Sequence, residues 1–301
     1  MKLWEKFLGF LVNPIMGIAL RQNKVPAFEQ FLKQALAMLD ATALSEIKTY
    51  IGRQQHQTGL FKDRAGNPDL YYSLFGYFLI TALELDSQTE KLKAALPNAF
   101  DKLNDEPVHL FCGIILHSQL IHNPSMNKDF KLKIRTVLDK LPPKDSGYLW
   151  FLGIVALYYL NDFYSIHNYL RKFRKQINSE KEHIPSTLIS IELILNSILK
   201  KPTEHLQKKL STYYRPTGGF AALTASPIDD LLSTAVCLYA LKFTGSDLRA
   251  IKPDAIAFVD SLYNEGGFVA TTFDVESDIE YTFYGLLALA SLNNDIEKYS
   301  F

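Results

Sequence analysis

Strongly apolar segments of helical length recur along this chain, and their spacing restricts the possible folds more than any other feature. They cover residues 69–85, 107–121, 147–160, 186–199, 230–243 and 278–292, so their starts lie 38 to 48 residues apart. More polar, amphipathic segments alternate with them, over residues 41–54, 89–103, 128–140, 163–177, 203–213 and 247–263. A helix that is apolar all round must be buried on every side, whereas an amphipathic helix can face water. The alternation predicts an all-α (α/α)6 toroid with six inner and six outer helices.

An open solenoid of helical hairpins shows the same alternation and is the alternative to a closed ring. We expect a single toroid domain over residues 41–301 and a helical extension over residues 1–40 that packs on it. The apolar residues with helical spacing in this extension are Trp4, Phe7, Leu8 and Leu11. They predict a short amphipathic helix that docks on the body of the protein or, alternatively, touches a membrane surface. The segment is too interrupted by charged residues and proline to span a membrane.

The charge balance and the cysteines narrow the classes of partner and compartment. Lys+Arg and Asp+Glu are equal at 32 each, so no excess of positive charge attracts nucleic acid, and membrane contact is at most peripheral. The two cysteines, Cys112 and Cys237, both lie in apolar segments. This placement predicts reduced core thiols and a cytoplasmic location rather than a disulfide framework.

Three of the connections into apolar helices share one detailed pattern. A glycine and an aromatic residue are followed by an aspartate and, four residues later, by a serine or threonine. The copies are Gly59-Leu60-Phe61 with Asp69 and Ser73, Gly218-Gly219-Phe220 with Asp230 and Thr234, and Gly266-Gly267-Phe268 with Asp278 and Thr282. Glycine permits a tight chain reversal, and each aspartate stands where a helix N-cap is expected. We predict that each aromatic ring fills the space between neighbouring repeats.

The arrangement GGF…D…YTFYGLLAL of residues 266–289 resembles the repeat of protein prenyltransferase β subunits and of squalene-cyclase-type terpenoid cyclases. Residues 55–61, QHQTGLF, are similar to the Gln-x-x-x-Gly-x-aromatic motif of the cyclases. The detailed likeness covers about residues 54–85 and 213–292. It implies an α/α toroid whose apolar centre holds an isoprenoid chain.

The chain departs from these relatives at the positions of their catalytic zinc. Aligned on the glycine turns, the resemblance places the zinc-binding Asp at Asp229, but Leu231 stands at the Cys position and Tyr281 at the His position. Zinc takes about four nitrogen, sulfur or oxygen ligands, so we expect no metal and no cofactor. Residues 219–228 also contain no basic residue of the kind that relatives use to bind a diphosphate.

The acid motif of the cyclases is incomplete as well. Class II terpenoid cyclases protonate an alkene with Asp-x-Asp-Asp, and the corresponding residues here are Pro227-Ile228-Asp229-Asp230, without the first acid. Two adjacent carboxylates in a low-dielectric cavity can share a proton, which raises the pKa of one of them. Proton-initiated chemistry therefore stays open, with Asp229 or Asp230 as the general acid.

Candidate functional residues lie near the starts of the inner helices. The catalytic candidates are Asp229, Asp230, Asp278, Glu280 and Tyr281. The substrate-binding candidates are Asp69, Tyr71, Tyr72, His109, Tyr148, Trp150, Phe220 and Phe268. Tyrosines near helix starts are favoured for a pocket, where their hydroxyls would need polar partners, and aromatic faces can stabilise a carbocation.

We therefore predict a protein of the prenyltransferase and terpenoid-cyclase type that binds a long apolar, isoprenoid or lipid-like molecule in the toroid centre. Its chemistry would be a zinc-independent, acid-assisted cyclase or transferase reaction. The alternative is a non-catalytic lipid-binding module or the partner subunit of an enzyme complex.

The acidic run before the last inner helix divides into two kinds of residue. Asp278 has counterparts in Asp69 and Asp230, so helix capping accounts for it. Asp274, Glu276 and Glu280 have no such counterparts and are expected to form an acidic lip beside a pocket.

Two other groups are assigned structural roles. His109, Cys112 and His117 share one inner helix, but about 12 Å separates the two histidines along its axis, so core or cavity-lining roles are favoured over metal ligation. The basic run of residues 168–183 spreads its charges around an outer helix. That pattern favours a solvated face over contact with a partner or with anionic headgroups.

Overall fold

The structure is a computed structural model that describes residues 28–101, 106–141, 147–176, 184–198 and 200–293. The amphipathic helix predicted near Trp4 lies outside these residues. Contacts divide the chain into two units, each described by itself below. Unit 1 contains Leu96–Asn178, and unit 2 contains Pro26–Ala95 and Ser179–Ile296.

The predicted alternation of apolar and more polar helices is confirmed. The apolar helices are α4 (Leu70–Ala82), α6 (Pro107–Leu120), α8 (Gly147–Tyr159), α10 (Ser186–Ile198), α12 (Leu231–Phe243) and α14 (Ile279–Leu292). The more polar helices are α3 (Ala41–Gln54), α5 (Asp86–Asp101), α7 (Asn127–Lys140), α9 (Phe163–Gln176), α11 (Glu204–Ser211) and α13 (Lys252–Ser261). Helix α13 starts five residues later than predicted, because Pro253 stands in its first turn and favours a helix start there.

In unit 1 the apolar helices α6 and α8 pack against each other, and the more polar helices α7 and α9 pack against α8. The short 3-10 helix η1 (Pro124–Met126) leads into α7. His117 of α6 is buried between the rings of Phe100 and Phe130, with 5.1 Å from the centroid of its ring to each. The core position predicted for this histidine is confirmed, and burial lowers its pKa.

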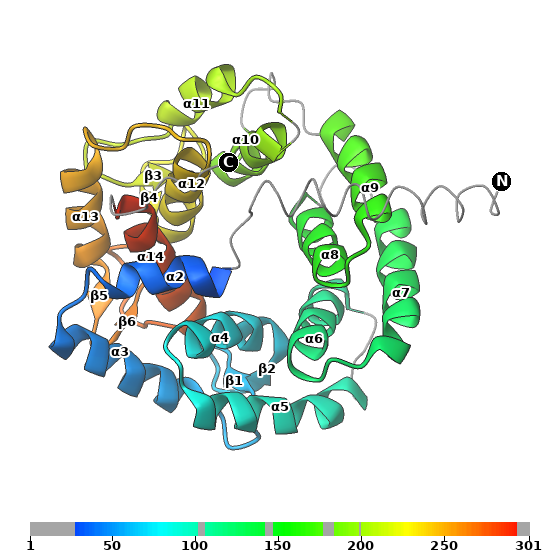
Figure 1. Cartoon of the computed structure of the whole chain (residues 1–301). Helices are drawn as coiled ribbons and strands as arrows, with labels where there is room; N and C mark the ends of the chain where they lie inside the picture. Colours follow the sequence, from blue (N-terminus) through cyan, green and yellow to red (C-terminus); the bar gives the residue numbers. More distant parts are fainter. Residues whose placement is uncertain (1–27, 102–105, 142–146, 177–183, 199, 294–301) are drawn as a thin grey trace. The chain divides into compact units, whose positions relative to one another are not determined.

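In unit 2 the apolar helices follow one another in space in the order α10, α12, α14, α4, with α11, α13 and α3 on their outer side (Figure 1). The last apolar helix, α14, therefore packs against the first, α4. At the turn before α14, a Cβ atom on Gly266 would lie 2.5 Å from the Glu46 carbonyl oxygen of α3, and the hydroxyl of Tyr263 donates to Glu46 Oε2 over 2.6 Å. An open solenoid, in which each repeat contacts only its neighbours along the chain, does not make these contacts.

A further helix, α2 (Phe28–Leu36), packs on α4 and α14. It is amphipathic, and its buried residues are Phe31, Leu32 and Ala35. The Lys33 side chain pairs with Glu84 over 2.7 Å, just beyond the end of α4, so α2 lies at the C-terminal end of that helix. The division of the chain at residue 40 stays a prediction.

The three predicted glycine turns have the same construction. In each turn the aromatic residue has two antiparallel partners, one before the glycine and one at the aspartate. On the aspartate side, β1 (Phe61–Lys62) pairs with β2 (Pro68–Asp69), β3 (Phe220–Ala221) pairs with β4 (Asp229–Asp230), and Phe268 forms a single bridge with Asp278. On the other side, β5 (Tyr263–Asn264) pairs with β6 (Gly267–Phe268), and the first two turns have single bridges there, Gln55 with Phe61 and Tyr214 with Phe220. The first glycines, Gly59, Gly218 and Gly266, have φ values of 98°, 96° and 90°, a region that a side chain disfavours.

A hydrogen-bond relay links each aromatic residue to its aspartate. In the last turn, the Phe268 N–H donates to Thr282 Oγ1 over 3.3 Å, and that hydroxyl donates to the Asp278 carbonyl over 2.7 Å. In the first turn, the Phe61 N–H donates to Ser73 Oγ over 2.8 Å, and this hydroxyl donates to the Asp69 carbonyl over 2.5 Å. The middle turn repeats the relay with Phe220, Thr234 and Asp230.

The rings of these aromatic residues are buried. Phe61, Phe220 and Phe268 expose at most 2% of their surface, and the rings of Phe61 and Phe268 lie on the glycines of the following inner helices, Gly76 and Gly285. The rings are therefore packed inside the fold, and their predicted place between neighbouring repeats stays a prediction. None of the helices within the described ranges combines the length and apolar character that a membrane span requires.

The close approach of Phe268 to Gly285 predicts a measurable cost for Gly285→Ala. The added Cβ would lie 2.5 Å from the Phe268 ring, so ring or helix must shift. We expect the free energy of unfolding to fall by about 1 to 3 kcal/mol, measured by urea unfolding followed by circular dichroism.

The matched control is Gly52→Ala in α3, where the nearest atom, Gln88 Nε2, is 3.7 Å from the added Cβ. This change should leave the free energy of unfolding unaltered or raise it by about 0.5 to 1 kcal/mol. Equal losses in both variants would contradict the packing described for Phe268.

Candidate functional site

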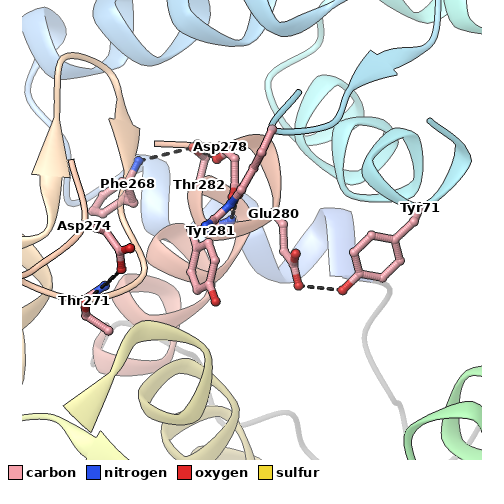
Figure 2. Close-up of polar contacts among 9 residues, drawn as sticks. Tyr71, Phe268, Thr271, Asp274, Asp278, Glu280, Tyr281 and Thr282 are labelled. Atoms are coloured by element: carbon pink, nitrogen blue, oxygen red, sulfur yellow. Dashed lines mark hydrogen bonds and ion pairs between the residues drawn. The ribbon is translucent and has the colours of Figure 1, made fainter. Parts of the chain in front are cut away.

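A carboxyl and a phenol meet where the last and first inner helices of unit 2 adjoin. The Tyr71 hydroxyl donates to Glu280 Oε1 over 2.6 Å (Figure 2). Both are the second residues of their helices, α4 and α14, and both follow a capping aspartate by two positions. The polar partner that sequence analysis required for a tyrosine near a helix start is therefore present for Tyr71.

Burial raises the pKa of Glu280 to about 7. The side chain is only 9% exposed, and removal from water disfavours its charged form. The Tyr71 hydrogen bond opposes this effect because it stabilises the carboxylate, the negative charge of Asp278 adds to it, and Arg64 opposes it. Glu280 is thus a carboxyl that changes protonation near neutral pH.

Arg64 lies in the loop between β1 and β2 and connects this site to the last repeat. Its Nε donates to Asp278 Oδ2 over 2.7 Å, and its guanidinium carbon lies 5.3 Å from the centroid of the Tyr281 ring. Asp278 is 4% exposed, so the guanidinium compensates a carboxylate that has little contact with water. Sequence analysis missed Arg64, because nothing in its local sequence points to a partner 214 residues away.

Two tyrosine side chains beside this ion pair have altered acidity. Burial, and then the neighbouring carboxylates, raise the pKa of both Tyr72 and Tyr281 to about 12. Asp278 and Glu280 contribute to both shifts. The two hydroxyls therefore stay protonated over the whole physiological range and can donate hydrogen bonds.

A continuous series of aromatic contacts leads away from Glu280. The ring centroids of Tyr71 and Phe75 are 4.9 Å apart, those of Phe75 and Phe283 are 5.2 Å apart, and those of Phe283 and Phe28 are 5.8 Å apart. Phe28 belongs to α2, so the series runs from the acid to the helix at the opposite end of α4. Flat aromatic faces of this kind suit contact with an apolar chain.

The remaining acidic candidates have identified partners. Asp69, Asp230 and Asp278 each accept a bond from the backbone N–H three residues on, at 2.9, 2.7 and 2.8 Å, which confirms their predicted N-cap role. Burial raises the pKa of Asp230. Asp229 is half-buried and accepts a hydrogen bond from the Thr217 hydroxyl.

The three residues of the predicted acidic lip, Asp274, Glu276 and Glu280, differ in burial and in their hydrogen-bond partners. Asp274 Oδ2 accepts bonds from the N–H and the hydroxyl of Thr271, at 3.0 and 2.8 Å, so this residue orders the loop before α14 (Figure 2). Glu276 is exposed, whereas Glu280 is buried against Tyr71. Only Glu280 of the three therefore belongs to the buried site.

The other substrate-binding candidates are divided between the two units. Phe220 and Phe268 are packed under their turns, and a role for them in binding a ligand stays a prediction. His109, Tyr148 and Trp150 belong to unit 1: His109 Nδ1 lies 3.3 Å from Glu106 Oε2, Tyr148 is 44% exposed, and Trp150 packs on Tyr169.

The cysteines lie in the core, and the described part of the basic run is on an outer helix. Cys112 and Cys237 are both buried, as predicted, and neither forms a disulfide. Within the basic run, Lys172 is exposed and pairs with Asp139 over 3.0 Å. Residues 177–183 of that run lie outside the described residues.

The residues at the relatives' zinc positions do not fit a metal ion. Leu231 is fully buried and matches Leu70 and Ile279, which directly follow the other two capping aspartates. Tyr72 and Tyr281 also correspond, because each lies three residues after a capping aspartate. Tyr281 faces the Arg64 guanidinium, and this positive charge would repel a metal ion. Within the described ranges, no three His, Cys, Asp or Glu side chains could together hold a metal ion.

Residues 27–104 and 159–300 match the prenyltransferase alpha-alpha toroid domain. These ranges contain more than half of the 301 residues, so the chain belongs to this family. The predicted all-α toroid fold and the resemblance to the prenyltransferase and terpenoid-cyclase superfamily are thereby confirmed. No curated protein and no solved structure matches the chain.

The ion pair of Arg64 with the buried Asp278 predicts that Arg64→Ala destabilises the protein. The change leaves the Asp278 carboxylate without its cation in a position of 5% side-chain exposure. Because Arg64 itself is half-exposed, we expect a loss of about 1 to 2 kcal/mol in the free energy of unfolding, rather than the larger cost of a fully buried pair. Arg249→Ala, which removes an exposed pair with Asp247, should cause no measurable change in the same urea titration.

The raised pKa of Glu280 predicts a pH-dependent stability difference. Between about pH 4.5 and 7 the folded protein keeps a proton that the unfolded chain releases, so Glu280 lowers the free energy of unfolding as the pH rises. Glu280→Gln removes this effect. We expect the free energy of unfolding of the variant, relative to the wild type, to increase by about 2 to 3 kcal/mol between pH 5 and pH 8.

The exposed Glu276→Gln provides the control, because its difference from the wild type should be the same at both pH values. A Glu280→Gln difference that is equally flat would show that Glu280 titrates normally and would contradict its buried environment.

Proposed function

We propose that this protein binds a long apolar, isoprenoid- or lipid-like molecule in the toroid centre beside Glu280, and that Glu280 donates a proton to it. Membership of the prenyltransferase alpha-alpha toroid family supports the general type of ligand. The observation that carries the chemistry is the buried Glu280, with a pKa of about 7 and the Tyr71 hydroxyl 2.6 Å away.

A carboxyl with this pKa is present in both protonation states at neutral pH, as a general acid requires. In the proposed step the O–H bond of Glu280 breaks, and the π electrons of an alkene form a C–H bond with the released proton. The neighbouring carbon becomes a cation, and Glu280 becomes a carboxylate that Tyr71 and Arg64 stabilise. Loss of a proton from the organic cation to Glu280 restores the carboxyl and forms a new alkene.

The aromatic residues near Glu280 support the binding of an apolar chain and the formation of a cation on it. In this proposal the apolar chain would contact Tyr71, Phe75 and Phe283, and the quadrupoles of their rings would stabilise a nearby positive charge. Asp230, the general acid favoured from sequence together with Asp229, is less suited, because its carboxylate already caps α12. We therefore assign the proton to Glu280.

A second candidate function is a non-catalytic lipid-binding module or partner subunit. Leu231 and Tyr281 favour it, because at two zinc-ligand positions of relatives this chain carries the residue types of its own other repeats. In this case Glu280 and Tyr71 would serve only to join the last repeat to the first. A cytoplasmic location is proposed for either function.

Deuterium incorporation separates the two. We would incubate the purified full-length protein in D2O with squalene or with a polyprenyl alcohol and analyse the recovered lipid by mass spectrometry. The catalytic proposal predicts incorporated deuterium, a rate that falls as the pH rises through about 7, and a loss of about 100-fold or more in Glu280→Gln.

Binding of the same probes is measured in parallel by native mass spectrometry. Glu276→Gln is the control, since an exposed carboxyl on the same chain segment should affect neither reading. Binding without deuterium in the wild type would favour the non-catalytic module. Absence of binding for every apolar probe would contradict both the catalytic proposal and the lipid-binding module, and would leave the partner subunit.

A further inference from the structure

The exposed large apolar residues of unit 2 are concentrated on two loops. Among the residues described in that unit they are Ile228 at 39%, Phe273 at 77% and Val275 at 82% exposure. Ile228 lies in the loop before α12, and the other two lie in the corresponding loop before α14. Single exposed apolar residues are ordinary, but a group of them on adjoining loops marks an interaction surface.

The loop of residues 271–277, here called the docking loop, is held in shape by its own polar contacts. Asp274 Oδ2 accepts two bonds from Thr271 (Figure 2). The Phe273 N–H donates to Thr271 Oγ1 over 3.3 Å. Asn264 Nδ2 donates to the Val275 carbonyl over 3.1 Å. The backbone that carries Phe273 and Val275 is therefore ordered while their side chains remain in water.

The two loops are joined at their bases. The Leu231 N–H, at the start of α12, donates to the Ala270 carbonyl over 2.9 Å. Ala270 directly precedes the docking loop, and Ile228 lies three residues before Leu231. This bond joins the two loops at their bases, and the exposed residues of both loops are together called one face of unit 2.

Carboxylates alternate with the apolar residues on this face. Phe273 and Val275 are each followed by an acid, Asp274 and Glu276, and Ile228 is followed by Asp229. A complementary surface must accept apolar side chains and also present positive charge to their neighbours.

We propose that the docking loop binds a partner protein that presents an apolar pocket bordered by lysine or arginine. Burial of Phe273 and Val275 in such a pocket removes apolar surface from water, and the basic border pairs with Asp274 and Glu276. This inference stands apart from the proposed chemistry, since none of these side chains contacts Glu280 or Tyr71 in the interactions described above.

The charges argue against two other occupants. An anionic membrane surface attracts basic segments and repels the carboxylates that flank each exposed apolar side chain. A symmetric pair of copies that met with this loop on the two-fold axis would place Asp274 and Glu276 beside the same carboxylates of the second copy. Only a partner with positive charge can both bury the exposed apolar side chains and pair with the carboxylates beside them.

The test uses a display library of random 12-residue peptides, selected on the immobilised full-length protein. We expect the selected peptides to combine aliphatic or aromatic residues with lysine or arginine. Their affinity, measured by fluorescence polarisation, should fall about tenfold or more in the double variant Phe273→Ser/Val275→Ser. Glu276→Lys should also weaken binding, because it reverses one charge and keeps the apolar residues.

Leu132→Ser is the matched control: it removes another exposed apolar residue, 60% exposed on α7, and should leave binding unchanged. Both Ser variants change exposed side chains, so thermal unfolding should match the wild type and exclude loss of fold. Peptides without basic residues, or equal affinity for the double variant, would overturn the proposal.

Two further measurements test the other occupants. Sedimentation with vesicles of phosphatidylcholine, with and without phosphatidylserine, should show no binding that depends on Phe273 and Val275. Analytical ultracentrifugation should show no self-association that the double variant abolishes. Either dependence would overturn the proposal in favour of a membrane or of a second copy.

Discussion

The relay from an aromatic N–H through a Ser or Thr hydroxyl to an aspartate carbonyl determines where each of three inner helices begins. It satisfies a buried backbone donor that would otherwise cost about 1 to 3 kcal/mol, and it does so with a hydroxyl on the first turn of the helix. The same aspartate then uses its carboxylate to cap that helix. One residue thus anchors the turn through its backbone and the helix through its side chain.

This anchoring makes the positions after the aspartate equivalent in all three repeats. The first is apolar and buried, as Leu70, Leu231 and Ile279. The second is Tyr71 in one repeat and Glu280 in another, and these meet because α14 packs against α4. The site therefore forms because the first and last repeats contact each other, and because one carries a tyrosine and the other a glutamate at the same repeat position.

The sequence predicts the periodic part of this structure well. The helices, the N-caps and the buried aromatic rings all follow from patterns within about 20 residues, where helix propensity, capping and turn chemistry act. The contacts of Arg64 with Asp278 and of Tyr71 with Glu280 join residues more than 200 positions apart. Periodicity indicates that repeats stack, but it does not tell which side chains meet when the last repeat contacts the first.

The loops between the aromatic residue and the aspartate of each turn can differ in sequence, because the hydrogen-bond relay fixes both of their ends. In the first repeat this loop carries Arg64, whose charge neutralises the buried Asp278 of the last repeat. In the last repeat it carries Phe273 and Val275, whose side chains are 77% and 82% exposed. The same structural position therefore serves stability in one repeat and remains available for recognition in another. A conserved helical framework with variable loops is the arrangement in which binding surfaces most readily differ between members of one family.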